Sequence, residues 1–285
     1  MNTLGPDLEC STASVEIRMR IVVCLKQDYD LAQLRYKSDG RTPLLEGLPL
    51  QLGSFEKNAL EQAVQFKEAA SREPGSEVEV VALSAGSAKL QESIKEALAM
   101  GADRAVLVVD PALGGADAAG TARVLAAAIQ KLGGADLILL GEGSDDEYTG
   151  QIPSRLAALL DLPQITIVRS LELEGGLIRA ARDLEHELEI VECERPAVVS
   201  VTSELNTPRL PPLSAILKAG RKPMDTWNLH DLGLSADSVG GPAAQIEVLS
   251  NLAPAQARKN VMLEGEVDRQ VEALLAALER EGVLP

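Results

Sequence analysis

Residues 141–151, Gly-Glu-Gly-Ser-Asp-Asp-Glu-Tyr-Thr-Gly-Gln, contain the residue types in this chain best suited to chemistry. The segment follows a predicted buried strand and ends directly before a predicted helix over 153–160. A helix start offers unpaired N–H groups and the positive end of the helix dipole, which suit a phosphate. The adjacent carboxylates Asp145, Asp146 and Glu147 could instead hold a metal ion or act as general acid and base, or the segment could be an ordinary solvated loop.

Signatures of other chemistries are absent from the sequence. His186 and His230 are the only histidines, and neither belongs to a zinc-binding or nucleophile motif. There is no CxxC, HExxH or GxSxG pattern, and neither the dinucleotide fingerprint GxGxxG nor a P-loop is present. We therefore expect no metal site and no catalytic triad.

The elements that must position the loop alternate between strands and helices. Apolar runs predict strands over 20–25, 77–84, 104–109, 135–140 and 196–201, and helical spacing predicts helices over 55–70, 88–100 and 118–132. Ser54 and Asp117 are expected N-caps, and Gly101 ends a helix where a left-handed residue is needed. This alternation predicts right-handed crossovers and a doubly wound α/β fold with a mostly parallel sheet.

Ligands of such sheets bind beyond the carboxyl ends of the strands. Three of those ends are residues 24–26, residues 83–86 and the 141–151 loop. Because the carboxyl ends of parallel strands share one edge, we expect these three segments to meet there. The loop and the helix that follows it would then receive a nucleotide phosphate.

The second half of the chain changes character. Turn residues within 164–194 predict antiparallel hairpins rather than another crossover, and Asp39-Gly40 predicts a smaller hairpin in the first half. Residues 233–254 are rich in Gly, Ser, Ala and Pro, and 264–281 predicts one amphipathic helix. Such an extended arm could pack on a partner subunit or on its own domain.

Composition limits the class of protein. The net charge is −16, which repels nucleic acid and anionic lipid, so neither is an expected partner. No apolar run is long enough to span a bilayer, and 46% hydrophobic residues suffice for a large core, so we expect a soluble protein. The cysteines Cys10, Cys24 and Cys193 are too few and too scattered for a disulfide framework, and residues 1–19 lack a signal peptide's apolar core. We expect a disordered lead-in over 1–19 and a cytoplasmic location.

Several motifs occur in a distinctive order along the chain. They are VCLK at 23–26, NALEQA at 58–63, ALAMGADR at 97–104, TGQ at 149–151, RPAVV at 195–199, and NTPR at 206–209 followed by ILKA at 216–219. From about residue 20 onward the chain resembles the β subunit of electron transfer flavoproteins. The resemblance implies an adenine-nucleotide-binding, Rossmann-like domain over 20–232 and a heterodimer with an α subunit that holds FAD.

The resemblance also implies a nucleotide pocket in this chain, filled by AMP in the carrier type or by a second FAD in the electron-bifurcating type. Backbone groups at Cys24 and Ala85 would meet the adenine or ribose, and Thr149 would meet phosphate. The implied residues are Cys24, Gly53, Ser54, Phe55, Glu56, Ala85, Gly141, Gly143, Ser144, Asp145, Asp146, Tyr148 and Thr149.

The chain departs from the family pattern at this pocket. Gly53-Ser54-Phe55 stands where the family shows Asn-Pro-Phe, which loses an amide side chain near the pocket. The 141–151 loop is shorter than the family's, and Glu142 replaces a basic residue, so its charge would repel a phosphate at close range.

A second segment bears on which nucleotide is held. Gly114-Gly-Ala-Asp117 with Thr121 resembles the segment that meets the second flavin in the bifurcating type, but Ala118 and Ala122 stand where threonine and serine belong. The same residues also fit a glycine turn and an N-cap. We favour AMP for this subunit and keep a second FAD as the alternative.

Residues 206–222 are implied to recognise a flavin-dependent dehydrogenase. Leu213 would insert into a hydrophobic pocket on that partner, and prolines restrict the loop before docking, which lowers the entropy lost on binding. The alternative is that Leu213 packs on the short helix of its own loop. The arm over 233–285 would pack on the α subunit. The other implied contact residues of the loop are Pro212, Ile216 and Lys218.

The expected function is therefore that of an electron carrier subunit, between flavin-dependent dehydrogenases and an acceptor such as a quinone oxidoreductase, with no catalysis by this chain alone. One alternative is the β subunit of an electron-bifurcating complex that takes electrons from NADH. Another is an adenine-nucleotide-binding regulatory module of the stress-protein kind, which needs neither the 206–222 loop nor the arm. An adenylating enzyme is disfavoured because its signatures are absent.

Overall fold

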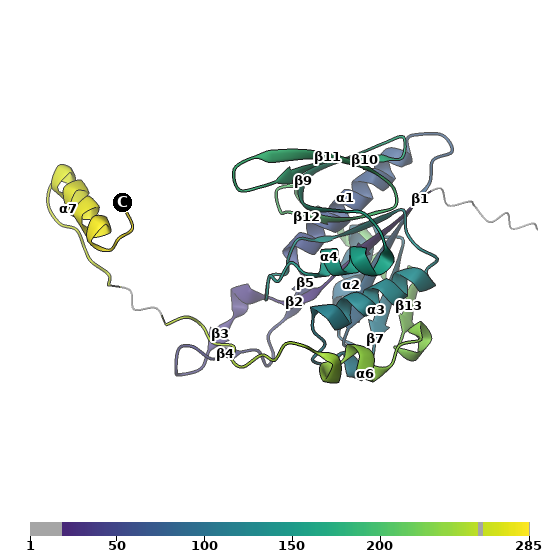
Figure 1. The fold of residues 1–285 in the computed structure, drawn as a ribbon, viewed down its shortest axis with the longest axis horizontal. Helices are drawn as coiled ribbons and strands as arrows, with labels where there is room; N and C mark the ends of the chain where they lie inside the picture. Colours follow the sequence, from purple (N-terminus) through teal and green to yellow (C-terminus); the bar gives the residue numbers. More distant parts are fainter. Residues whose placement is uncertain (1–18, 256–258, 285) are drawn as a thin grey trace, which may run out of the picture. The chain divides into compact units, whose positions relative to one another are not determined.

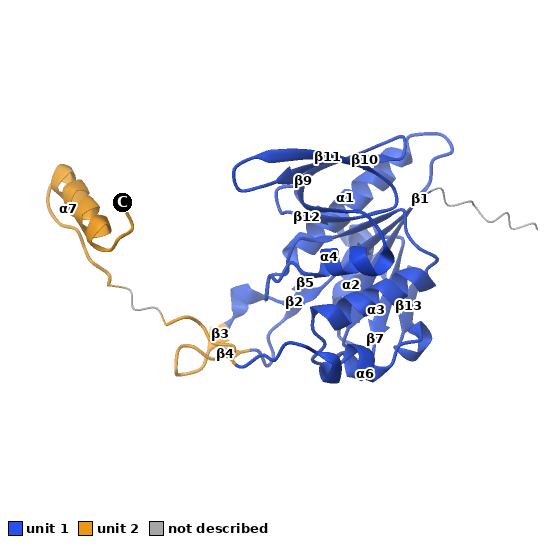
Figure 2. Cartoon of the chain, in the orientation of Figure 1, with its two compact units in different colours: residues 1–34, 45–249 blue, residues 35–44, 250–285 orange. Residues whose placement is uncertain are grey.

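The structure is a computed structural model that describes residues 19–255 and 259–284. The expected lead-in lies outside the described residues except for Met19, which begins the first strand. The chain falls into two compact units, coloured separately in Figure 2. Unit 1 comprises 1–34 with 45–249, and unit 2 comprises 35–44 with 250–285.

Nine strands of the described chain form the central sheet of unit 1, in the order β11-β10-β9-β12-β8-β1-β6-β7-β13 (Figure 1). The pairs from β9 through to β13 are all parallel, and β10 and β11 extend one edge as antiparallel strands. The strands are β1 (Met19–Cys24), β6 (Val78–Gly86), β7 (Arg104–Val109), β8 (Leu137–Gly141), β9 (Gln164–Glu174), β10 (Leu177–Asp183), β11 (Leu188–Glu194), β12 (Ala197–Val201) and β13 (Met224–Trp227).

Helices cover both faces of this sheet (Figure 1). One face carries α1 (Ser54–Ala70) and α2 (Leu90–Met100), with α5 (Leu213–Ala219) beside α2, and the other carries α3 (Ala118–Lys131) and α4 (Ile152–Leu160). Alternate residues of a strand therefore enter different cores. In β1, Ile21 and Val23 belong to the first core and Val22 and Cys24 to the second. Burial on both faces explains why these strands are continuous apolar runs.

Short elements complete unit 1. They are the strand pair β2 (Gln27–Tyr29) and β5 (Leu50–Leu52), and the helical turns η1 (Leu31–Gln33), η2 (Pro111–Leu113), η3 (His230–Leu232), α6 (Ala236–Val239) and η4 (Gly241–Ala243). Residues 233–249, expected as the start of the arm, belong to this unit.

The strand order reverses beside β1. The chain runs from β1 outward through β6 and β7, and then returns to the opposite side of β1 to add β8 and β12. At such a switch point the connections that leave the two neighbouring strands diverge, which opens a crevice beyond their carboxyl ends. Here the crevice lies beyond β1 and β8.

The doubly wound α/β prediction is confirmed, and so are the antiparallel hairpins, which are β9, β10 and β11. One detail is wrong and one strand was missed. The N-cap of α1 is Gly53 rather than Ser54, whose side chain bonds elsewhere. The edge strand β13 was not predicted, because Met-Asp-Thr-Trp alternates too weakly to show a buried face. Asp117 does cap α3, where its side chain accepts a hydrogen bond from the Gly120 N–H.

Unit 2 contains a small hairpin and a helix. Strands β3 (Arg35–Tyr36) and β4 (Pro43–Leu44) pair around the predicted Asp39-Gly40 turn. The helix is α7 (Val267–Arg280), which confirms the amphipathic helix predicted at the end of the chain. None of the helices within the described residues is both long and apolar enough to cross a bilayer.

Gly101 offers a test of this packing. Its φ is +143°, and a Cβ would lie 2.8 Å from both γ carbons of Val64. We expect Gly101→Ala to lower the free energy of unfolding by about 2–4 kcal/mol, from backbone strain and overpacking together. Urea denaturation measures this change.

The control is Gly134→Ala. Gly134 has φ +89° but no neighbouring atom within 4 Å of the added Cβ, so only backbone strain of about 1 kcal/mol is expected. Adding Val64→Ala should recover part of the Gly101→Ala loss. Equal losses at Gly101 and Gly134 would show that contact with Val64 does not matter.

Candidate functional site

A cavity of about 610 Å³ opens beyond the carboxyl ends of β1 and β8. Sites for small ligands generally measure roughly 300–1,000 Å³. The wall combines the end of β1 with Lys26, the end of β6 at Ala85, the start of α3, the 141–151 loop and the start of α4. The three strand ends that the sequence predicted to meet therefore line one cavity.

Most of the predicted site residues lie in this wall: Cys24, Glu56, Ala85, Asp117, Thr121, Gly141, Gly143, Ser144, Asp146 and Thr149. Leu25 and Lys26, from the predicted strand end over 24–26, also line the cavity, and so do Ile246 and Val248, which sequence reasoning did not assign. Ile246 and Val248 come from the expected arm, where their alternation with polar residues was the only signal. Gly53, Ser54, Phe55, Asp145 and Tyr148 are not among the lining residues.

These non-lining residues hold α1 against the loop. Asp145 accepts hydrogen bonds from the Ser54 N–H at 2.8 Å and from the Ser54 hydroxyl at 2.5 Å. The rings of Phe55 and Tyr148 lie 5.6 Å apart. Gly141 has no room for a side chain, because a Cβ would lie 2.6 Å from Cβ of Phe55. The first turn of α1 therefore braces the loop from outside the cavity.

Lys26 is the one cationic side chain among the described residues that line the cavity, and carboxylates of the protein already pair with it. Its Nζ lies 2.5 Å from Oδ1 of Asp146 and 3.4 Å from Oδ1 of Asp28, and it donates to the Ser144 hydroxyl at 3.2 Å. Burial opposes the charged form of Lys26, but the hydrogen bond to Asp146 and the surrounding carboxylates outweigh this and raise its pKa. The lysine therefore stays charged and fixes the loop to the end of β1.

The remaining charge in the wall is acidic. Asp117, Glu142, Asp146 and Glu147 all line the cavity. Burial raises the pKa of Glu142, partly offset by the hydrogen bond that its carboxylate accepts from the Tyr148 hydroxyl. No group of His, Cys, Asp and Glu side chains within the described chain is placed to hold a metal ion. A ligand with several negative charges would be repelled here, since few cations compensate the acids.

Backbone donors at the start of α4 suit a single anionic group. Residues 149–153 line the cavity, and Gln151 at the N-cap makes no side-chain cap hydrogen bond, so the N–H groups of Ile152 and Ser154 are free of a side-chain cap, whereas Pro153 has no N–H. The start of α3 differs, because Asp117 already accepts from the N–H groups of Gly120 and Gln245. The start of α4 is therefore the part of the wall where an anionic group meets the least competition from the chain's own side chains.

Comparison with known proteins shows what family this geometry belongs to. Residues 45–232 match the family model of the electron transfer flavoprotein domain. The chain is 35% identical over 260 residues to the electron transfer flavoprotein subunit beta of Mycobacterium bovis, covering 90% of this chain and 97% of that protein. The chain belongs to the electron transfer flavoprotein family.

Within that family the chain matches β subunits along nearly their whole length. It is 32% identical over 267 residues to the subunit beta of Thermoanaerobacterium thermosaccharolyticum, covering 93% of this chain and 100% of that one. It is 34% identical over 263 residues to the caffeyl-CoA reductase-Etf complex subunit CarD of Acetobacterium woodii, covering 92% and 98%. The chain is therefore an electron transfer flavoprotein β subunit, which implies an α subunit as its partner. These matches give no support to the regulatory-module alternative.

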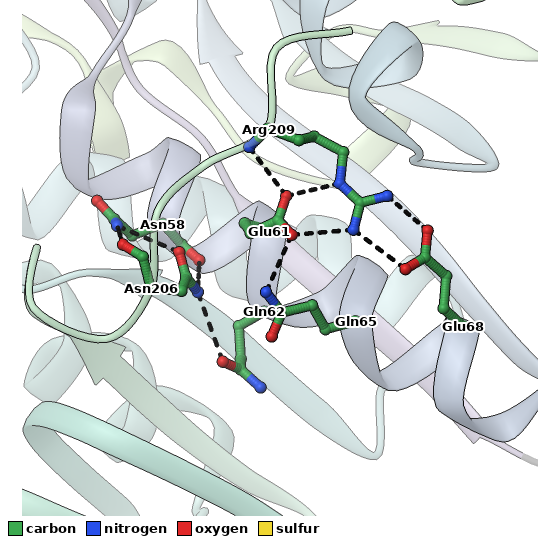
Figure 3. A network of polar contacts seen from close by, with 7 residues as sticks. All are labelled: Asn58, Glu61, Gln62, Gln65, Glu68, Asn206 and Arg209. Carbon is green, nitrogen blue, oxygen red and sulfur yellow. Dashed lines mark hydrogen bonds and ion pairs between the residues drawn. The ribbon is translucent and has the colours of Figure 1, made fainter.

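The loop that bears the Asn-x-Pro-Arg motif of this β subunit is anchored to α1 (Figure 3). Asn58 and Asn206 exchange hydrogen bonds between side-chain amide and backbone carbonyl, at 2.7 and 3.0 Å. The Arg209 guanidinium bonds both oxygens of Glu61, at 2.7 and 2.9 Å, and also reaches Glu68 at 2.5 Å. Two neighbouring segments distant in sequence are thereby locked together at the start of the loop.

Glu61 is the buried member of this network. Its side chain is 5% exposed, whereas that of Glu68 is 50% exposed. Burial opposes ionisation of Glu61, but hydrogen bonds from Arg209 and Gln65 outweigh it and hold the pKa below its ordinary value. The ion pair is therefore intact at neutral pH and is lost only as the pH falls into the acid range.

The far part of the loop is exposed rather than packed. Leu213 and Leu217 are each 71% exposed, and Ile216 is 51% exposed. Pro212 and Lys218 are exposed as well. Leu213 is therefore not buried against its own helix, and the loop presents apolar side chains on an anchored base.

The network predicts unequal roles for the two glutamates. We expect Glu61→Gln to raise the rate of limited proteolysis within residues 206–222 by about thirtyfold, because weakening a buried pair costs about 2 kcal/mol. Trypsin cleavage followed by mass spectrometry measures this rate.

Glu68→Gln is the matched control. This carboxylate is half exposed, so its replacement should change the rate by less than about threefold. Comparable effects of the two variants would contradict the assignment of Glu61 as the main anchor.

Proposed function

We propose that this electron transfer flavoprotein β subunit binds AMP in the cavity beyond β1 and β8, while its α subunit holds the FAD. The flavin, when bound, supplies the redox chemistry. The residues of this chain bind a nucleotide, orient the partner loop and pack against the α subunit. This chain positions the partner proteins and the α subunit. Electrons pass from a flavin-dependent dehydrogenase to an acceptor through the α-subunit flavin.

The observation that carries the AMP assignment is that the cavity has a single place for an anion, at the start of α4, and otherwise an acidic wall. The start of α4 offers backbone donors for one phosphate, and Lys26 is already paired with Asp146. The same wall carries Asp117 and Glu142, whose negative charges oppose a second phosphate. Asp117, the residue shared with the second-flavin segment, is occupied by its hydrogen bonds to Gly120 and Gln245. These contacts favour AMP over a second FAD.

The partner surfaces are proposed from exposed apolar residues. The 206–222 loop would recognise a flavin-dependent dehydrogenase through Leu213, whose anchored base keeps it extended into solvent. Within unit 2, α7 exposes an apolar stripe that would pack on the α subunit: Val267, Val271, Leu274 and Leu275. We also propose a cytoplasmic location, which the free thiols of Cys24 and Cys193 support.

The cofactor content of the heterodimer tests the nucleotide assignment. Heat extraction of the purified αβ complex followed by chromatography should give one FAD and one AMP per heterodimer. Two FAD and no AMP would instead establish the bifurcating alternative, and the absence of any nucleotide other than the α-subunit flavin would refute a site in this chain.

The partner loop is tested by Leu213→Ala. We expect electron transfer from the cognate dehydrogenase to slow about thirtyfold at low carrier concentration, because an apolar anchor is worth about 2 kcal/mol. Leu188→Ala is the control, since Leu188 is a 55% exposed leucine on β11 outside the loop. If Leu213→Ala lowers thermal stability and leaves transfer unchanged, the leucine has only a packing role.

A further inference from the structure

Residues 245–249, which we call the flap segment, border the cavity within unit 1 and belong to no helix or strand. Ile246 and Val248 line the cavity, whereas Glu247 and Leu249 do not and are exposed. Successive side chains of an extended chain point to opposite sides, and the segment follows this alternation. One side of the flap segment is therefore apolar and belongs to the cavity wall.

The two apolar side chains of the flap segment are not covered by the protein itself. Ile246 is 58% exposed and Val248 is 72% exposed. Other apolar residues of the same wall, such as Leu125 on α3 and Leu140 on β8, are buried in the second core. Covering exposed apolar surface is favourable, so these two side chains offer a ligand in the cavity an apolar contact that the core residues have already made with each other.

The chain leading to the flap segment is seated tightly beside the start of α3. A Cβ at Gly120 would lie 2.2 Å from the carbonyl oxygen of Val239, and a Cβ at Gly240 would lie 2.3 Å from that of Ala112. Val239 is fully buried. Because two glycines allow this close backbone contact, the turns α6 and η4 give the flap segment a fixed base.

One hydrogen bond sets the register of the flap segment. Asp117 accepts from the Gly120 N–H through one carboxylate oxygen and from the Gln245 N–H through the other, both at 2.9 Å. From residue 246 to residue 252 no backbone N–H group bonds another described residue. The segment is thus held at its first residue and can turn about it. Since a shift of one residue exchanges the two sides of an extended chain, this bond decides which side chains face the cavity.

Resting on the AMP site proposed above, we propose that the flap segment covers the bound nucleotide, with Ile246 and Val248 packed on the adenine ring and Asp117 as the positioning residue. Aliphatic side chains neither donate nor accept hydrogen bonds, so contact with phosphate or ribose hydroxyls would desolvate those groups without compensation. The faces of the adenine ring carry no such cost, and the phosphate has its own place at the start of α4.

The first test is the affinity of the αβ complex, freed of bound nucleotide, for AMP and for adenosine, measured by calorimetric titration. Ile246→Ala should weaken the binding of both by about tenfold, and Val248→Ala, which removes fewer carbons, by about threefold. The factor should be the same for AMP and adenosine, because the lost contact does not involve the phosphate.

Two control variants show whether the contact itself matters. Ile246→Leu keeps an apolar side chain of the same size and should bind AMP within about threefold of the unaltered complex. Leu249→Ala is the matched control, since Leu249 is an exposed leucine of the same segment that does not line the cavity, and it should change the affinity by less than about twofold. Thermal stability and α-subunit flavin content, measured for each variant, identify loss by misfolding.

Asp117→Asn tests the positioning bond. The amide keeps one oxygen for the start of α3 but cannot accept from both N–H groups. Adenosine is the probe, because the substitution also removes a negative charge that opposes phosphate. We expect adenosine binding to weaken about fivefold in the otherwise unaltered complex and by less than about twofold further in the Ile246→Ala Val248→Ala background, where the positioned side chains are gone.

The outcomes separate the flap segment from the site. If the unaltered complex binds AMP and Ile246→Ala and Val248→Ala match it, or if Leu249→Ala loses as much as they do, the role of the flap segment is refuted while the AMP site stands. Binding of AMP without measurable binding of adenosine also contradicts it, because the contact with the base would then contribute too little. If the unaltered complex binds neither, the proposed function of the cavity fails, and the flap segment loses its ligand.

Discussion

The reversal of strand order beside β1 is the constraint on which the rest of the structure depends. With right-handed crossovers, strands added in one direction put their helices on one face of the sheet, and strands added in the other direction put them on the opposite face. The chain builds outward through β6 and β7 and then returns across β1 to add β8, so both faces are covered. The connections after β1 and β8 then leave in different directions, and nothing in the sheet fills the space between them. The cavity, its glycine-bearing loop and the position of Lys26 all follow from this one reversal.

The chemistry of the cavity is set by how the chain uses its charges. Lys26, the one lysine among the described residues of the cavity wall, pairs with Asp146 and so holds the loop. Asp117 accepts hydrogen bonds from the backbone N–H groups of Gly120 and Gln245. The start of α4, where the N-cap residue makes no side-chain hydrogen bond, is the part of the wall that remains for an anionic group. With its lysine already paired and acids along its wall, the cavity offers an anionic ligand little net electrostatic attraction.

Sequence reasoning located the site well where local signals and fold rules agree. The strand over 104–109 was predicted to the residue, because Gly101 stops the preceding helix and an apolar run follows. Loop 141–151 was placed at the carboxyl edge because it follows a strand of a sheet predicted to be parallel, in which strands end at a common edge. Sequence reasoning could not show that Ile246 and Val248 return to the wall, since so short an alternation does not say what the segment packs against. It could not show either that Ser54 bonds Asp145 instead of capping α1, because this contact joins residues far apart in sequence.

Helix α1 contributes residues both to the cavity wall and to the anchor of the 206–222 loop. Its first turn carries Glu56 in the cavity wall, and its next turns carry Asn58 and Glu61, which hold the Asn-x-Pro-Arg loop. Because α1 is one continuous helix of 17 residues, a molecule bound in the cavity and a protein docked on the loop would both contact the same rigid element. Thermodynamic linkage makes any such effect mutual: if the bound nucleotide changes the affinity of the loop for its partner, the partner changes the affinity of the cavity for the nucleotide by the same factor. A nucleotide that exchanges no electrons would in this way act as a structural ligand, because it would stabilise the helix that holds the 206–222 loop.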